Sequence, residues 1–324
     1  MKKIYILKKP NFIDFNEKSN DLMNKYFPMH YNIVELNLED SIKFIQNSKS
    51  NDIIIIFYLL ESVWKVEIFK YLKKNKPLGI IIFRTDDFWH RGIGRKNYEK
   101  YYWKFFFKNI YNFKITSFTN IETLENVKNI SLKNNSSNIY TFNYWCVYDK
   151  AICKFNKNSI NKILLTGKIG FAYPERDIIK KYKNIESYSY NSKQIKVNSN
   201  DFNLILNNYL CCFTSSISLI NSKTKKRVSV HIFLLKIFEI LGSGSLLLYP
   251  KKEEDYIKKI GLYHKKNCWL IDFNSDIQSQ IDYIIDIKNR KQIDEIRFAG
   301  WTHGKDNLNS LNKFNEFNNL IKNI

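Results

Sequence analysis

The sequence has few of the features on which disulfide-bonded or metal-bound small domains depend. It contains five cysteines, an odd number, and no two of them have the C-x-x-C spacing. Neither a disulfide framework nor a zinc knuckle is indicated, and a reducing compartment fits these cysteines best. No H-E-x-x-H or similar spacing predicts a metal site, and no G-x-S-x-G elbow predicts a serine hydrolase.

Long hydrophobic runs are also missing. The longest, "IIIIFYLL" at residues 53–60, is much shorter than the roughly 20 residues that cross a bilayer, and it is typical of a strand buried on both faces. The basic start "MKKIYILKKP" has an apolar stretch too short for a signal peptide. We therefore expect a cytoplasmic protein with no membrane span.

Acidic residues are in the minority. The chain has 52 Lys and Arg against 31 Asp and Glu, a net charge of +21, which could attract nucleic acid, a membrane surface or a phosphorylated substrate. However, the lysines are scattered, and Lys, Asn and Ile are abundant throughout, as in proteins of AT-rich genomes. We attribute most of the charge to this bias and expect no nucleic-acid partner.

What the chain does have is a repeated alternation of strand-like and helix-like segments. In the first half, strands are expected at 3–7, 31–36, 52–59, 78–84 and 113–118, with helices at 40–46, 61–75 and 98–110. In the second half, strands are expected at 162–167, 209–216, 245–249 and 267–273, with helices at 173–182 and 228–241 and more helices towards the end. This order predicts parallel sheets with helices on both faces.

A polar stretch at 131–140 interrupts the alternation, so we place a linker near 145–160. The predicted domains are 1–150 and 151–324. The fold class expected is α/β, with two Rossmann-like domains facing a cleft.

The helix expected at 228–241 carries Lys236 and Glu239 on one face. A helix this apolar should be buried, where a charge is costly unless it has a partner. Two interpretations stay open: a mutual ion pair at the helix edge, or a polar edge that faces a ligand. The following "GSGS" lacks the spacing of a phosphate loop and is expected to stop the helix at Gly242. Anions should prefer the other end, at 227–232, where backbone N–H groups would be available beside Arg227.

These residues resemble a known family. "KIFEILGSGSLLLYP", residues 236–250, looks like the (R/K)-x-F-E-x-L-x-x-G-x-x-L signature of group 1 glycosyltransferases, closest to the spore-maturation-type branch with a GT-B fold. "KILLTGKIGFAYPER", residues 162–176, is similar to the opening of that branch's C-terminal domain. The resemblance covers about residues 160–300. The first half matches only in its alternation of strands and helices and in "IIIFRTDDFWH".

The resemblance implies a donor site for a nucleoside diphosphate sugar. Glu239 matches the glutamate that holds the ribose hydroxyls, and Lys236 matches a basic residue that could reach the diphosphate. Gly167 and Lys168 match the loop beneath the donor phosphates. Arg176 matches an arginine that could bind phosphate, although a structural role at the helix start is an equal alternative.

Three further residues complete the expected donor site. Thr214 and Ser215 follow a strand, at the edge where open α/β sheets bind ligands. His231 stands eight residues before Glu239, where many relatives carry an acidic residue.

Candidate catalytic residues lie in the first half. Asp87 and His90, in "FRTDDFWHRGIGR", follow a strong strand and could act as a general base or orient an acceptor hydroxyl. The alternative is a polar surface loop in which Asp86 caps the next turn. "TDD" does not have the D-x-D spacing of a metal-binding motif, and the resemblance implies that no metal or cofactor is needed besides the sugar nucleotide.

The function expected is transfer of a sugar from a nucleoside diphosphate sugar to a hydroxyl group of a glycan, protein or lipid. Two other classes stay open. One is a non-catalytic protein that binds sugar nucleotides or nucleic acid. The other is a GT-B-like epimerase that acts on the sugar nucleotide itself.

Overall fold

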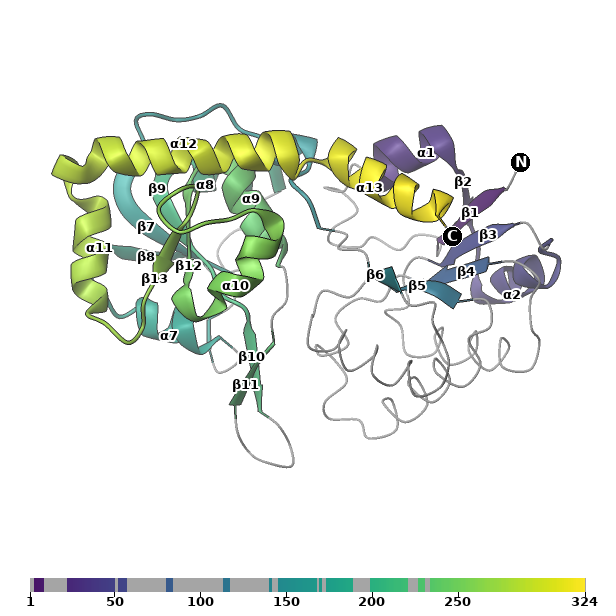
Figure 1. The fold of residues 1–324 in the computed structure, drawn as a ribbon, viewed down its shortest axis with the longest axis horizontal. Helices are drawn as coiled ribbons and strands as arrows, with labels where there is room; N and C mark the ends of the chain where they lie inside the picture. Colours follow the sequence, from purple (N-terminus) through teal and green to yellow (C-terminus); the bar gives the residue numbers. More distant parts are fainter. Residues whose placement is uncertain are drawn as a thin grey trace. The chain divides into compact units, whose positions relative to one another are not determined.

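The chain divides into two compact units (Figure 1). The first comprises residues 1–17, 22–144 and 316–324, and the second comprises 18–21 and 145–315. The computed structural model describes residues 3–8, 22–49, 52–56, 80–83, 113–116, 140–141, 145–167, 169–170, 173–188, 199–220, 227–230 and 234–323.

The first unit contains a parallel sheet with the strand order β2-β1-β3-β4-β5-β6. Its strands are β1 (Ile4–Lys8), β2 (Asn32–Glu35), β3 (Ile53–Ile56), β4 (Ile80–Phe83), β5 (Phe113–Thr116) and β6 (Tyr140–Thr141). A π-helical turn (Leu22–Tyr26) leads into α1 (Phe27–His30), and α2 is Leu38–Gln46. The end of the last helix, α13 (Ser310–Lys322), packs on α1 in this unit, with the rings of Phe27 and Phe317 5.0 Å apart.

The second unit contains another parallel sheet, in the order β13-β12-β9-β7-β8. Its strands are β7 (Ile160–Thr166), β8 (Ile185–Tyr188), β9 (Tyr209–Phe213), β12 (Leu246–Pro250) and β13 (Trp269–Ile271). Its helices are α7 (Pro174–Ile179), α8 (Ser199–Asn208), α9 (Leu235–Ser243), α10 (Glu254–Ile257), α11 (Ile277–Ile285) and α12 (Arg290–Asn307). Two parallel α/β sheets confirm the fold class that the alternating pattern predicts.

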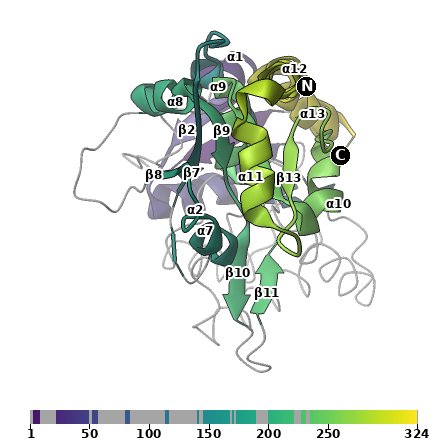
Figure 2. The same cartoon turned by 90° about the vertical axis from the view of Figure 1, so that its left-hand side faces the viewer.

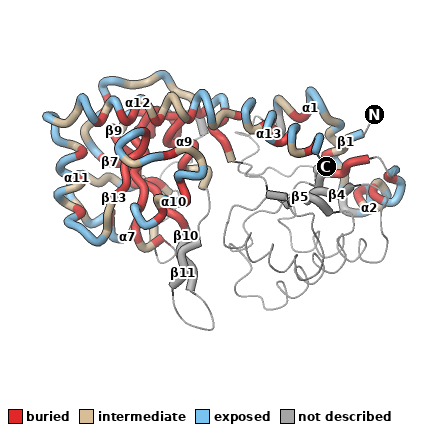
Figure 3. Tube along the Cα trace, in the orientation of Figure 1, coloured by how far each residue is buried: buried red, intermediate tan, exposed pale blue. Residues whose placement is uncertain are grey.

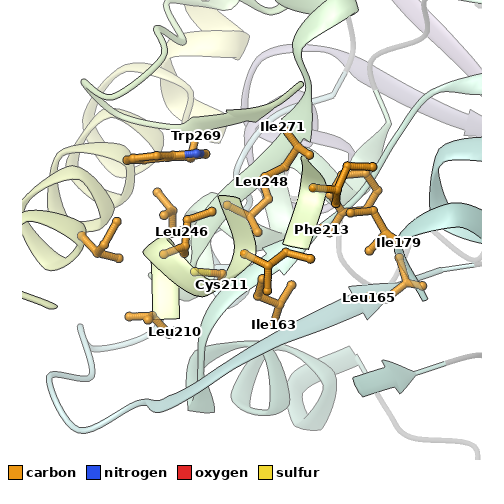
Figure 4. Close-up of a cluster of buried hydrophobic side chains, with 14 of the residues drawn as sticks. Ile163, Leu165, Ile179, Leu210, Cys211, Phe213, Leu246, Leu248, Trp269 and Ile271 are labelled. Atoms are coloured by element: carbon orange, nitrogen blue, oxygen red, sulfur yellow. The ribbon is translucent and has the colours of Figure 1, made fainter. Parts of the chain in front are cut away.

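One large hydrophobic cluster of the second unit lies on one face of its sheet. Alternate residues of three strands, such as Ile163 and Leu165 of β7, Cys211 and Phe213 of β9, and Leu246 and Leu248 of β12, pack together there (Figure 4). Isoleucines of α7, α11 and α12 cover them. Buried residues are accordingly concentrated in these strands (Figure 3). Each such aliphatic side chain contributes about 1.5–3 kcal/mol by leaving water, so this layer fixes the sheet that carries the site.

The helix expected at 228–241 begins later than predicted. Residues Arg227–Val230 form strand β11, which pairs antiparallel with β10 (Ile217–Ile220), and this hairpin projects from the unit (Figure 2). Helix α9 starts only at Leu235. Valine at 228 and 230 alternates with polar residues, a period-two pattern that favours a strand once a partner strand is present. The expectation of a helix N-terminus at 227–232 is therefore wrong.

The glycine-rich turn stops the helix, but two residues beyond the predicted position. Gly242 lies inside α9, where a Cβ atom would come within 2.8 Å of Val147 Cγ1 and 2.9 Å of the Ala151 carbonyl oxygen. Gly244 is the C-cap, with φ of 80° in the left-handed region that favours glycine. One glycine thus permits close packing and the other ends the helix.

Among the described helices, none combines the length and apolar character needed to cross a bilayer.

Candidate active site

Several of the residues predicted to bind a donor lie at the carboxyl edge of the second unit's sheet. Gly167 directly follows β7, and Thr214 and Ser215 directly follow β9, the neighbouring strand. Because parallel strands end at a common edge, these residues meet where open α/β sheets bind ligands.

Arg176 of α7 joins these residues. Its Nη2 donates hydrogen bonds to Thr214 Oγ1 at 2.9 Å and to the Ser215 carbonyl oxygen at 2.7 Å. Its guanidinium lies 4.1 Å from the centroid of the Tyr173 ring. A Cβ atom on Gly167 would lie 2.7 Å from Arg176 Nη1. We call these five residues the arginine centre; four of them are predicted site residues, and the structure brings them together.

Arg176 is only 2% exposed. Burial lowers the pKa of its guanidinium to about 10, although nearby Tyr173, Tyr249, Glu175 and Glu253 act in the opposite direction. The Arg176 side chain reaches from α7 to the residues that follow β9. Its hydrogen bonds therefore hold α7 against the carboxyl edge of the sheet. In this arrangement the structural role considered for Arg176 has direct geometric support.

A second polar group, which sequence reasoning missed, borders the arginine centre. The Ser216 hydroxyl donates to Glu253 Oε2 at 2.5 Å and lies 2.7 Å from the Tyr249 hydroxyl. Burial raises the pKa of Tyr249 well above its ordinary value. Lys252 forms an ion pair with the buried Glu175 of α7. The signal available in the sequence was the run of three acidic residues, 253–255, shortly after the end of strand β12.

Lys236 and Glu239 of α9 form a separate group. Lys236 Nζ lies 2.5 Å from Glu239 Oε2 and 3.8 Å from the centroid of the Phe202 ring of α8. The Tyr148 hydroxyl donates to Glu239 Oε1 at 3.3 Å. We call these four residues the carboxylate centre. The mutual ion pair, one of the two interpretations of the sequence, is confirmed; a ligand-facing role for the pair stays a prediction.

Sequence reasoning missed Tyr148 and Phe202. Tyr148 lies in the segment that the sequence assigns to a linker, and α8, which carries Phe202, was not predicted as a helix. No motif marks either residue, and only the tertiary structure places them beside Glu239.

Four predicted site residues, Asp87, His90, Lys168 and His231, lie outside the described residues. Within the described part of the chain, no group of three His, Cys, Asp or Glu side chains is arranged to hold a metal ion.

Both units are thus open parallel sheets of the Rossmann-like class, and this architecture is shared with solved structures. HepE of Anabaena in complex with UDP and glucose is similar over the full length of both chains, with a TM-score of 0.60 and 6% identity. An α-glucosyltransferase in complex with UDP and a 13-mer DNA matches over 99% of each chain, with a TM-score of 0.55 and 12% identity.

The pneumococcal O-GlcNAc transferase GtfA, in complex with UDP and GlcNAc, matches 88% of this chain with a TM-score of 0.52 and 12% identity. The matched region spans 59% of the GtfA chain. No protein-family model and no curated protein matches the sequence. At these identities the likeness shows the fold: the chain has the two-domain α/β fold of GT-B glycosyltransferases.

Proposed function

We propose that the protein is a glycosyltransferase that moves a sugar from a nucleoside diphosphate sugar to a hydroxyl group of a glycan, protein or lipid acceptor. The observation that carries the proposal is Glu239, a carboxylate that is 7% exposed and hydrogen-bonded at both oxygens, on a fold whose solved neighbours include complexes with UDP. The signature around Glu239 supports the group 1 family and its spore-maturation-type branch.

The donor would be held by the second unit. Glu239 would accept hydrogen bonds from the ribose hydroxyls, and charged acceptors make such bonds strong. Lys168 would approach the diphosphate next to Gly167, whose φ of 86° lets the backbone turn sharply. Thr214 and Ser215 would border the donor, and His231 would face its sugar.

Leaving-group stabilisation would come from fixed donors rather than from a metal. The first amides of α9, at Leu235 and Lys236, begin a helix that has no side-chain cap at Leu234. Such amides, together with Lys168, would stabilise charge that develops on the diphosphate. Asp87 and His90 of the first unit would orient the acceptor hydroxyl or remove its proton.

Calorimetry with UDP, GDP, ADP and dTDP tests the donor proposal. The wild type should bind at least one of them, and Glu239→Ala should lose that binding together with the thermal stabilisation it provides. Glu186→Ala is the matched control, because Glu186 also pairs with a lysine and a tyrosine, Lys162 and Tyr209, but at the β8 edge of the sheet. The proposal fails if the wild type binds none of the four nucleotides.

A second candidate function involves nucleic acid. One solved neighbour is a complex with DNA, and this chain carries a net charge of +21. Binding to DNA would weaken steeply as the salt concentration rises, whereas the first proposal needs no such dependence.

The epimerase alternative is tested by incubating a sugar nucleotide with the protein alone. An epimerase would convert the sugar nucleotide under these conditions, since it needs no acceptor.

A further inference from the structure

Tyr148 is held firmly in place beside Glu239. It is 3% exposed and lies in the segment that opens the second unit. The backbone around it is tied down by three hydrogen bonds: Val147 N to the Leu308 carbonyl at 2.8 Å, Ala151 N to the Tyr148 carbonyl at 2.8 Å, and Cys153 N to the Gly242 carbonyl at 3.0 Å. The hydroxyl of Tyr148 therefore approaches α9 from a fixed position.

The carboxylate of Glu239 receives one donor on each oxygen. Tyr148 donates to Oε1 at 3.3 Å, and Lys236 donates to Oε2 at 2.5 Å. Lys236 is itself held against the ring of Phe202. A carboxylate has about four acceptor positions, so these two donors leave one position on each oxygen. The two remaining positions match two hydroxyl groups on adjacent carbon atoms.

We infer that Tyr148 is a positioning residue that orients Glu239 to read a vicinal diol, so that the site selects ribonucleotides over deoxyribonucleotides. The inference rests on the proposed function and names the donor class more narrowly. Without the tyrosine hydroxyl, the carboxylate is held at Oε2 alone and can rotate about its terminal torsion, which is broad when unrestrained. Both ribose contacts then lose their geometry.

The test compares UDP with 2′-deoxy-UDP by calorimetry, in the wild type, Tyr148→Phe and Tyr209→Phe. If GDP or ADP binds more tightly than UDP, that nucleotide and its 2′-deoxy form are used. Tyr209→Phe is matched because it also removes a tyrosine hydroxyl that donates to a glutamate, Glu186, on another strand of the same unit. The wild type should prefer the ribonucleotide, and Tyr148→Phe should lower that preference by roughly fivefold, as the loss of one hydrogen bond predicts. Tyr209→Phe should keep it.

The outcomes separate the two proposals. If the wild type binds none of the nucleotides, the proposed function fails and this inference fails with it. If the wild type binds UDP and its 2′-deoxy form equally, or if Tyr148→Phe weakens both by the same factor, only the inference is overturned. Should Tyr148→Phe not fold, Lys236→Met removes the donor on the other oxygen from a partly exposed side chain, and the same fall in preference is expected.

Discussion

Two of the buried charged residues in the second unit, Glu239 and Arg176, have different kinds of partner. In the carboxylate centre, Glu239 faces a counter-ion, Lys236, whose side chain is 19% exposed. In the arginine centre, the described hydrogen bonds of Arg176 go to a hydroxyl and a carbonyl oxygen, and its guanidinium lies over a tyrosine ring. Both residues belong to segments that resemble the same family.

This difference predicts that Glu239 can accept hydrogen bonds from a ligand, whereas Arg176 stabilises the fold. A carboxylate at a partly exposed ion pair can accept hydroxyl groups from a ligand without leaving a charge stranded. Removing Arg176 has a different effect, because it leaves the Thr214 hydroxyl and the Ser215 carbonyl without this donor in a buried place. Arg176 should therefore govern stability, and the carboxylate centre should govern binding.

The largest effect is expected from Arg176→Met. Thr214 and the Ser215 carbonyl would lose their donor in a buried place, and we expect a loss of about 3 kcal/mol in the free energy of unfolding. Urea denaturation measures it. Arg176→Lys should recover only part of the loss, because an ammonium group lacks the planar fork. A variant as stable as the wild type would contradict a structural role.

Gly167→Ala should have the next largest effect. At φ of 86° any side chain is strained, and the new Cβ would also lie 2.7 Å from Arg176 Nη1. We expect a loss of about 2 kcal/mol in the free energy of unfolding. Gly170→Ala is the control: its φ is 131°, but no atom of the described residues lies within 4 Å of the added atom. Equal losses in the two variants would mean that contact with Arg176 adds nothing.

The sequence was a good guide to the layers of the fold. Strands such as β3 and β12 lie in apolar runs that begin directly after a polar residue, and local pattern alone identifies them. It failed at β11, because Val228 and Val230 fit either a helix or a strand, and pairing with β10 decided between them. The partner strand β10 precedes the segment assigned to the helix, so the pattern within that segment alone did not include it.

The candidate site was predictable only in part. Thr214 and Ser215 followed from topology, since parallel strands share an edge, whereas Gly167 followed from the family resemblance. The partners of Glu239 did not, because Tyr148 is 91 residues away in sequence. Burial also escaped prediction: the sequence left Arg176 either as a phosphate ligand or as a structural residue at a helix start, and only the packing shows that it lies inside.

A smaller effect is expected from Lys236→Met. Losing the counter-ion of Glu239 should weaken binding of UDP by about fivefold, and it should also lower the free energy of unfolding, because the Glu239 side chain is only 9% exposed and would keep its charge without the ammonium group. The affinity for uridine should fall by the same factor as the affinity for UDP, since the Lys236 ammonium group pairs with the Glu239 carboxylate. A larger loss for UDP would indicate the diphosphate contact that the sequence predicts.

Lys252→Met is the matched control for that variant. Lys252 also pairs with a buried glutamate, Glu175, but beside the arginine centre. It should leave the affinity for UDP unchanged. If Lys252→Met weakened UDP binding as much as Lys236→Met does, the two centres would not differ in the way proposed.

The smallest effect expected is that of chelation. If fixed amides and lysines compensate the diphosphate, EDTA should leave the affinity of the wild type for UDP unchanged, and added Mg²⁺ should not raise it. Calorimetry of dialysed protein with and without EDTA measures this, with Glu239→Ala as the non-binding reference. A fall in affinity on chelation would mean that a metal ion supplies the positive charge that compensates the diphosphate. The donor site would then have to include acidic residues that hold this ion. An unchanged affinity would instead mean that groups of the protein alone compensate the charge of the diphosphate.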